Sequence, residues 1–283
     1  MSELDLRITP ARGDIAAAFL KGQVEAKAFV EGVRFQVATS TAAIRKSADA
    51  GAEQVNQALF GETFMAYEQH QGWAWGQLES DGYVGYMSLN NLVERLSEPT
   101  HRVSVLRTFV FERPDLKSPV VLTLSTNAKV RVDSEERGFA KIAGSGWVFR
   151  THIASLADRE PDFVAVAERY LGAPYLWGGR ESIGLDCSGL VQAALEAAGV
   201  KVLRDSDMQA ASVGAMIDPG EGFANLKRGD LVFWTGHVGI MLDATRLIHA
   251  NAWHMAVEIE PLAEAVARIR PVAGEVKVVR RLG

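Results

Sequence analysis

The chain has 283 residues, of which 48% are apolar and 23% charged, a composition typical of a globular protein with room for two or three domains. Its formal net charge of −5 argues against the basic surface that nucleic acid or an anionic membrane requires, so neither is expected as a partner. The single cysteine, Cys187, excludes a disulfide within the chain.

The N-terminal segment, residues 1–33, begins MSELDLRITP, with acidic residues where a signal peptide is basic and without the apolar region that follows one. Nowhere does the sequence approach the roughly 20 apolar residues that span a bilayer. We therefore expect a cytoplasmic protein. Between residues 14 and 30, apolar side chains such as Ile15, Phe19 and Val30 stand among charged ones, which predicts a helical segment.

Residues 34–97 change to the alternating pattern of short strands. Strands are predicted at residues 35–39, 43–46, 63–68, 73–78 and 83–87, with turns rich in glycine between them. Short strands at this spacing are typical of a small barrel. The segments 59–62 (LFGE), 73–75 (WAW) and 81–86 (DGYVGY) resemble those of a bacterial SH3-like domain, so we expect one here.

Residues 98–158 repeat this plan more loosely. Strands are predicted at residues 101–105, 120–125, 128–133, 139–142 and 146–149. The closing Gly-Trp-Val of residues 146–148 parallels Val-Gly-Tyr at 84–86. We therefore expect a second, divergent SH3-like barrel.

Residues 159–283 are expected to form a third domain, which begins with a helix at 163–170. A loop rich in glycine and aromatic residues, 172–179, precedes Cys187. After Cys187, apolar residues recur at the intervals of a buried helix face until Gly199, which is a suitable stop. The thiol is thus predicted at a helix N-terminus, where free N–H groups and the helix dipole lower a cysteine pKa.

A lone cysteine is most often a small buried apolar residue. The position of Cys187 between Asp186 and Ser188, directly after a glycine-rich loop, is unusual for a core residue and favours a nucleophile. A nucleophile also requires a base. Residues 227–251, predicted as two or three short strands, supply the candidates His237 and His249.

From about Pro161 to its end the chain resembles the catalytic domain of the NlpC family of bacterial cell-wall cysteine peptidases, compact relatives of the papain fold. The matching segments occur in the family's order: YLGAPY (170–175), WGG (177–179), DCSG (186–189), RDS (204–206) with Gln209, GDLVF (229–233), HVGI (237–240) and IHA (248–250). The resemblance implies an α+β chain, in which a papain-like domain follows two small all-β barrels.

The resemblance also implies the chemical roles. Cys187 would attack an amide carbonyl as a thiolate, His237 would hold the thiolate as an imidazolium and later protonate the leaving amine, and His249 would orient His237. His254 is the alternative for the orienting role. The backbone N–H of Cys187 and, by resemblance, Tyr175 would stabilise the oxyanion.

Substrate binding is expected next to the nucleophile. Asp186 and Ser188 can cap the helix. Relatives that cut peptides with a free N-terminal L-alanine use these two positions to bind the substrate's ammonium, and the two roles are compatible.

In relatives with preceding SH3-like domains, the first barrel closes one end of the cleft and offers an acidic residue and a tyrosine to the same ammonium. Glu53 and Tyr86 are the matches predicted here. Glu62, Glu79 and Tyr83 remain alternatives.

The sequence thus predicts an endopeptidase that cuts the γ-D-Glu–diamino acid bond of peptidoglycan stem peptides with a free L-Ala, for recycling. An exported hydrolase of intact cell wall, or an inactive protein that binds wall peptides, are the competing interpretations. No cofactor is expected, and no metal either, because Cys187 and His237 lie too far apart in sequence for a compact pair of zinc ligands.

Overall fold

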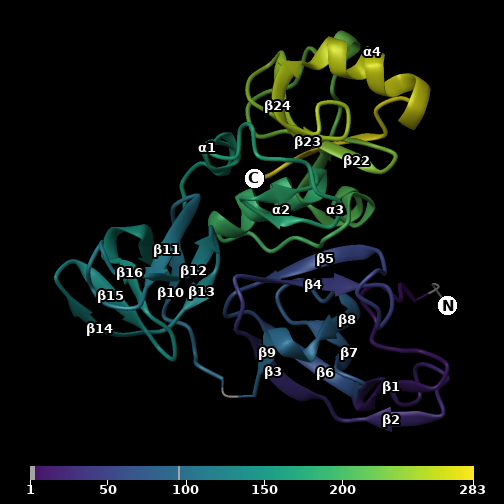
Figure 1. Cartoon of the computed structure of the whole chain (residues 1–283). Helices are drawn as coiled ribbons and strands as arrows, with labels where there is room; N and C mark the ends of the chain where they lie inside the picture. The colour runs from purple at the N-terminus through teal and green to yellow at the C-terminus, as the bar shows by residue number, and fades with distance from the viewer. Residues whose placement is uncertain (1–3, 95) are drawn as a thin grey trace. The chain divides into compact units, whose positions relative to one another are not determined.

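The computed structural model describes residues 4–94 and 96–283, and the chain divides between Asp158 and Arg159 into two compact units (Figure 1). The first unit consists of β-strands around separate hydrophobic cores. The second unit combines an antiparallel sheet with α-helices. Cys187, His237 and His249 all belong to the second unit.

The prediction of a helix between residues 14 and 30 is wrong. The segment contains β1 (Ile15–Ala17), a 3-10 turn (Ala18–Leu20) and β2 (Ala28–Val30), and the two strands pair in parallel. Gly22, with a φ of +84°, lies in the connection, where a residue with a side chain would be strained. The apolar residues pack in a small cluster of their own that includes Tyr67, so their spacing reflects strands and turns rather than one helix face.

The first all-β body is one antiparallel sheet of seven strands in the order β5-β4-β8-β7-β6-β3-β9. Its strands are β3 (Val33–Val37), β4 (Thr41–Arg45), β5 (Gln54–Leu59), β6 (Thr63–His70), β7 (Trp73–Leu78), β8 (Val84–Ser88) and β9 (Leu92–Val93), with a 3-10 turn at Leu89–Asn91. Alternate side chains such as Ile44, Phe64 and Met87 point inward and form the core. The five predicted strands are confirmed. Strand β5 escaped prediction because it buries polar Asn56 and Gln57.

The second all-β body holds two sheets, with strand orders β12-β11-β16-β15-β14 and β13-β10-β17. Its strands are β10 (His101–Val103), β11 (Arg107–Phe111), β12 (Val120–Ser125), β13 (Lys129–Val130), β14 (Val132–Glu136), β15 (Phe139–Ile142), β16 (Trp147–Phe149) and β17 (Ile153–Ser155), with a 3-10 turn at Arg150–His152. Buried Val110, Leu124 and Val148 lie in its core.

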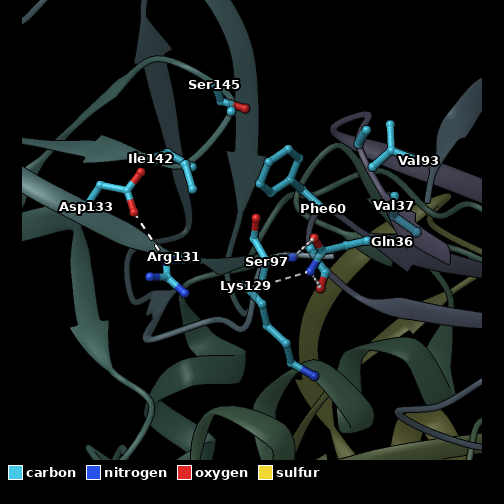
Figure 2. A pocket seen from close by; sticks show the side chains of 14 residues that line it. Gln36, Val37, Phe60, Val93, Ser97, Lys129, Arg131, Asp133, Ile142 and Ser145 are labelled. Atoms are coloured by element: carbon cyan, nitrogen blue, oxygen red, sulfur yellow. Dashed lines mark hydrogen bonds and ion pairs between the residues drawn. The ribbon is translucent and has the colours of Figure 1, made fainter. Parts of the chain in front are cut away.

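Residues of both all-β bodies line one pocket of about 410 Å³, shown in Figure 2. On one wall the Gln36 amide donates to the carbonyl of Ser97, while its own oxygen accepts from the Ser97 N–H. Arg131 on another wall is paired with Asp133. The backbone N–H of Lys129 donates to the carbonyl of Phe60, so the chain is hydrogen-bonded directly across this junction.

The second unit is built on an antiparallel sheet of six strands in the order β20-β25-β21-β22-β23-β24. The strands of this unit are β18 (Arg180–Glu181), β19 (Gly184–Leu185), β20 (Ala215–Ile217), β21 (Leu231–Trp234), β22 (His237–Met241), β23 (Arg246–Asn251), β24 (Ala256–Pro261) and β25 (Val278–Arg281). Its helices are α1 (Phe163–Glu168), α2 (Cys187–Ala197), α3 (Ser206–Ser212) and α4 (Leu262–Ala273), with a 3-10 turn at Glu221–Phe223.

Helix α2 is the central helix of this unit. Its residues are buried nearly all round, and it lies against β22 and β23 as well as α1. Helix α4 instead buries one face, including Leu262 and Ile269, against Met241 and Leu247 of the sheet. The strand pair β22–β23 therefore lies within reach of both the first residue of α2 and the side chains of α4.

Candidate active site

Cys187 is the first residue of α2, as predicted, and Asp186 is the helix cap. The Asp186 carboxylate accepts the backbone N–H of Gly189 at 2.8 Å, in the manner of capping aspartates. Gly189 also passes so close to the preceding loop that an added Cβ would lie 2.2 Å from the carbonyl oxygen of Gly179. The sequence Asp-Cys-Ser-Gly thus fixes the start of the helix and the position of the thiol, which is 7% exposed.

Arg204 holds Asp186 from the other side. The guanidinium donates to both carboxylate oxygens, at 2.9 and 2.6 Å, and to the Ser188 hydroxyl at 2.8 Å. Gly178 N–H donates to the same carboxylate at 2.8 Å. All of these side chains are buried, so the negative charge of Asp186 is balanced within the protein. The binding of a substrate ammonium by Asp186 remains a prediction. This carboxylate already has several partners within the protein.

The hairpin β21–β22 brings His237 to the thiol. The Cys187 Sγ donates to the carbonyl oxygen of Gly236 at 4.0 Å, and the backbone N–H of Val238 lies near enough to the sulfur to lower the thiol pKa. These two residues flank His237 in the chain. The helix start and the first residue of β22, which are fifty residues apart in sequence, therefore meet at one point.

His249 lies next to His237 on the adjacent strand. His237 Nε2 and His249 Nδ1 are 2.8 Å apart, and the two rings are tilted by 59° with centroids 5.0 Å apart. Because Nε2 of His237 is bonded to His249, Nδ1 is the His237 nitrogen left to accept a proton from the thiol. The alternative, His254, has its ring nitrogen Nδ1 3.0 Å from the side-chain oxygen of Asn251, so His249 is the histidine positioned to orient His237.

Sequence reasoning missed Glu260. This residue lies on β24, and its Oε1 atom is 2.6 Å from Nε2 of His249. Arg268 of α4 pairs with the same oxygen. No local motif marks Glu260; its only signal is its place in a strand that follows the Ile-His-Ala strand, where pairing puts it on the His249 side of the sheet.

Burial disfavours the charged forms of both Cys187 and His237. It raises the pKa of the Cys187 thiol to about 12, with the nearby Asp186 charge adding to the rise. Burial likewise lowers the pKa of His237 well below its ordinary value, and His249 and Arg268 lower it further. The expected lowering of the thiol pKa by its helix position is therefore outweighed in this structure by desolvation.

Tyr175 lies near the thiol in the loop before α2. Its N–H donates to the carbonyl of Met255, and it forms a bridge with Leu185. Burial raises the pKa of its hydroxyl, and negative charge on Cys187 or Asp186 would raise it further. The hydroxyl thus stays protonated and can act as a hydrogen-bond donor.

The residues predicted from the first barrel lie in the first unit. Glu53 pairs with Lys46 at an exposed position, and the Tyr86 hydroxyl accepts a hydrogen bond from Arg12 at 2.6 Å. Tyr86 also lines a pocket of about 320 Å³ with Trp75 and Glu68, which does not include Glu53.

The three alternatives for those positions are all engaged within the same unit. Glu62 is buried and accepts the N–H of Leu59 at 2.7 Å. Glu79 pairs with Arg34, and Tyr83 is buried.

Within residues 4–94 and 96–283, no cluster of three or more His, Cys, Asp or Glu side chains is arranged to hold a metal ion. None of the helices in the same ranges is both long and apolar enough to cross a membrane.

Two segments of the sequence match known families. Residues 172–273 match the NlpC/P60 family, and residues 44–92 match the bacterial dipeptidyl-peptidase SH3 domain. The first match spans the helix with Cys187 and both histidines. The second spans β5 to β8 of the first all-β body.

Known proteins are similar over most of the chain. The gamma-D-glutamyl-L-lysine dipeptidyl-peptidase of Bacillus subtilis (strain 168) is 25% identical over 237 residues, covering 74% of this chain and 76% of that protein. Dipeptidyl-peptidase 6 of Lysinibacillus sphaericus is 26% identical over 251 residues, covering 76% of this chain and 87% of that protein.

A solved structure shares the fold. An NlpC/P60 family protein from Bacillus cereus ATCC 10987 superposes with a TM-score of 0.74 and covers 88% of this chain and 99% of its own, at 20% identity. Most of this chain therefore has the fold of that protein. Residues 172–273 thus form an NlpC/P60 domain, and residues 44–92, which precede it, match a bacterial SH3 domain of the dipeptidyl-peptidase type.

Proposed function

We propose that this protein is a cysteine peptidase that hydrolyses the bond between γ-D-glutamate and the next diamino acid in peptidoglycan stem peptides with a free N-terminal L-alanine. The observation that carries the proposal is the Cys187 thiol at the start of α2, against the backbone on both sides of His237, with His249 bonded to that histidine. The name of the Bacillus subtilis relative, a gamma-D-glutamyl-L-lysine dipeptidyl-peptidase, supports the choice of bond.

The reaction would use the neutral pair as a general base and a nucleophile. The sulfur of Cys187 attacks the γ-carbonyl carbon of D-Glu while the thiol proton passes to Nδ1 of His237. The Cys187 backbone N–H and the Tyr175 hydroxyl donate to the resulting oxyanion. The C–N bond then breaks as His237 gives its proton to the leaving amine. Water, deprotonated by His237, hydrolyses the thioester and restores the thiol.

Recognition of the free alanine amine is the second part of the proposal. Asp186 and Ser188 are next to the nucleophile, although Arg204 already neutralises the carboxylate. In the first unit, Tyr86 lines a pocket whose acidic member is Glu68, and Glu53 does not line it. Arg12 already lies in this region, with its guanidinium 4.4 Å from the Trp75 ring centroid and bonded to Glu68, so a substrate amine would have to compete with it.

A recycling role in the cytoplasm follows from this preference. A stem peptide carries a free L-alanine amine only after its release from the glycan, so an enzyme that requires this amine acts on detached peptides. We also infer that the second all-β body is a second SH3-like barrel, which completes an α+β chain of two barrels and one papain-like domain. Its two small antiparallel sheets around a single core support that inference.

The test is release of L-Ala-D-Glu from L-Ala-γ-D-Glu-diaminopimelate. Wild type should release it, and Cys187→Ala should not. The matched substrate control is the same peptide with its N-terminus acetylated, which should be cut much more slowly. If the wild type does not release L-Ala-D-Glu, or if Cys187→Ala releases it equally well, the protein is not this cysteine peptidase. Equal cleavage of the acetylated peptide would refute the amine requirement. Cleavage of intact sacculi would favour a wall hydrolase.

A further inference from the structure

Glu260 and Arg268 continue the site beyond the pair of histidines. The Glu260 side chain is 12% exposed, and its Oε1 atom is shared by His249 Nε2, at 2.6 Å, and by the guanidinium of Arg268. His249 itself is fully buried. Four side chains thus form one hydrogen-bonded row: His237, His249, Glu260 and Arg268.

The row has only one consistent placement of protons when the imidazoles are neutral. An ionised carboxylate only accepts, so His249 must carry its proton on Nε2. The Nδ1 atom of His249 is then bare and accepts from Nε2 of His237 across 2.8 Å. That leaves Nδ1 of His237 without a proton. A bare Nδ1 is what a general base next to Cys187 requires.

We propose that Glu260 is a positioning residue that selects this tautomer of both histidines. Arg268 keeps Glu260 ionised, and its positive charge limits how strongly Glu260 favours a protonated His249 or His237. This inference rests on the proposed function, because it assigns His237 the role of base. Glu260 touches neither substrate nor sulfur, and it acts through His249.

The charges in the row predict effects of opposite sign. Burial opposes ionisation of Glu260, but its hydrogen bond with His249 and the charge of Arg268 together lower its pKa. Glu260 favours a proton on His249, whereas Arg268 disfavours one on His249 and on His237. The other ionisable groups that face the pair are Cys187 from α2, His254 from the loop after β23, and Glu258, opposite His249 on β24.

Three variants separate these effects from a loss of structure. Glu260→Gln keeps the shape but removes the charge, and Glu260→Asp keeps the charge on a shorter side chain. Arg268→Met removes the opposing charge. Glu258→Gln is the matched control, since it removes one carboxylate from the same strand, opposite His249, without removing a contact of the row.

The first measurement needs no substrate. We expect Glu260→Gln to slow alkylation of Cys187 by iodoacetamide at neutral pH, because the thiolate–imidazolium pair loses a stabilising charge. Arg268→Met should accelerate it, and Glu258→Gln should change it less than Glu260→Gln does, because it is Glu260 that bonds to His249. In ¹⁵N spectra of the imidazoles, His237 should carry its proton on Nε2 in the wild type. Equal alkylation rates in Glu260→Gln and wild type, or a proton on Nδ1 of His237, would overturn the proposal.

The second measurement is the pH profile of peptide hydrolysis. Glu260→Gln should lower kcat by about 10- to 100-fold with little change in KM, less than the loss seen when a carboxylate bonded directly to a catalytic histidine becomes an amide. Its acid limb should move to lower pH, that of Arg268→Met to higher pH, and Glu260→Asp should recover part of the rate. Limbs that move in the same direction would contradict the assignment.

Failure of the two proposals would look different. If the peptide is not a substrate, hydrolysis is absent in the wild type, while the alkylation rates and the imidazole spectra still report on the row. If Glu260 has no positioning role, the wild type cuts the peptide and Glu260→Gln retains its rate and its pH profile.

Discussion

Arg204 donates to both carboxylate oxygens of Asp186, at 2.9 and 2.6 Å, and both side chains are buried beneath the start of α2. The residue that caps α2 is thus also half of a buried ion pair. Such a pair adds little stability against an apolar replacement of both partners, but loss of one partner leaves a buried charge alone.

Arg204→Met should therefore destabilise the protein by about 3–5 kcal/mol, because the Asp186 carboxylate loses its only guanidinium among the contacts described here. Urea denaturation of the full chain measures this loss. The control is Arg228→Met, which removes two exposed pairs, with Asp162 and Glu168, and should cost about 1 kcal/mol or less. Equal losses of unfolding free energy in the two variants would show that the buried Arg204 pair contributes no more to stability than an exposed pair.

Gly189→Ala should disturb the helix start. Its added Cβ would lie 2.2 Å from the carbonyl oxygen of Gly179, a backbone atom that cannot move without shifting the loop before Cys187. We expect a loss of about 1–3 kcal/mol and reduced alkylation of the thiol. Gly13→Ala is the control, since no atom lies within 4 Å of its Cβ position. A wild-type melting temperature for Gly189→Ala would contradict the close approach.

The pH dependence of Cys187 alkylation tests the neutral resting pair. Because burial raises the thiol pKa to about 12, the iodoacetamide rate should be low at pH 7 and still rising above pH 9, beyond the ordinary thiol pKa of about 8.5. Cys187→Ala, which has no other cysteine, provides the blank. A rate that is already constant between pH 5 and 8 would instead indicate a preformed thiolate–imidazolium pair.

Acid should destabilise the protein through His249. Burial lowers its pKa, although Glu260 raises it in part, so below the unfolded value of about 6.5 the unfolded chain binds the proton more readily than the folded one. Stability is then present above that pH and is lost as the pH falls, by at most about 1.4 kcal/mol per pH unit for one histidine. Melting curves from pH 7.5 to 5.5 should show a shallower decline in His249→Gln than in wild type, each referred to its own value at pH 7.5.

Local patterns in the sequence were sufficient for the main elements of the catalytic unit. Residues 187–197 have the periodicity of a buried helix with Asp186 as its cap, and residues 231–251 form short apolar runs separated by turn residues, which are typical of buried strands. The same reasoning failed at residues 14–30, where strands and a turn place apolar residues at irregular intervals, and at β5, whose buried polar residues conceal the pattern.

The sequence by itself determined which residue is the nucleophile candidate, which histidines accompany it, and the family to which the motifs belong. Tertiary structure alone decided that Arg204 neutralises Asp186, that Glu260 and Arg268 continue the row from His249, and that burial raises the pKa of the thiol. Each of these depends on side chains brought together from distant segments and on the removal of water around them. Burial and charge pairing are properties of the packed chain, and no spacing within one element encodes them.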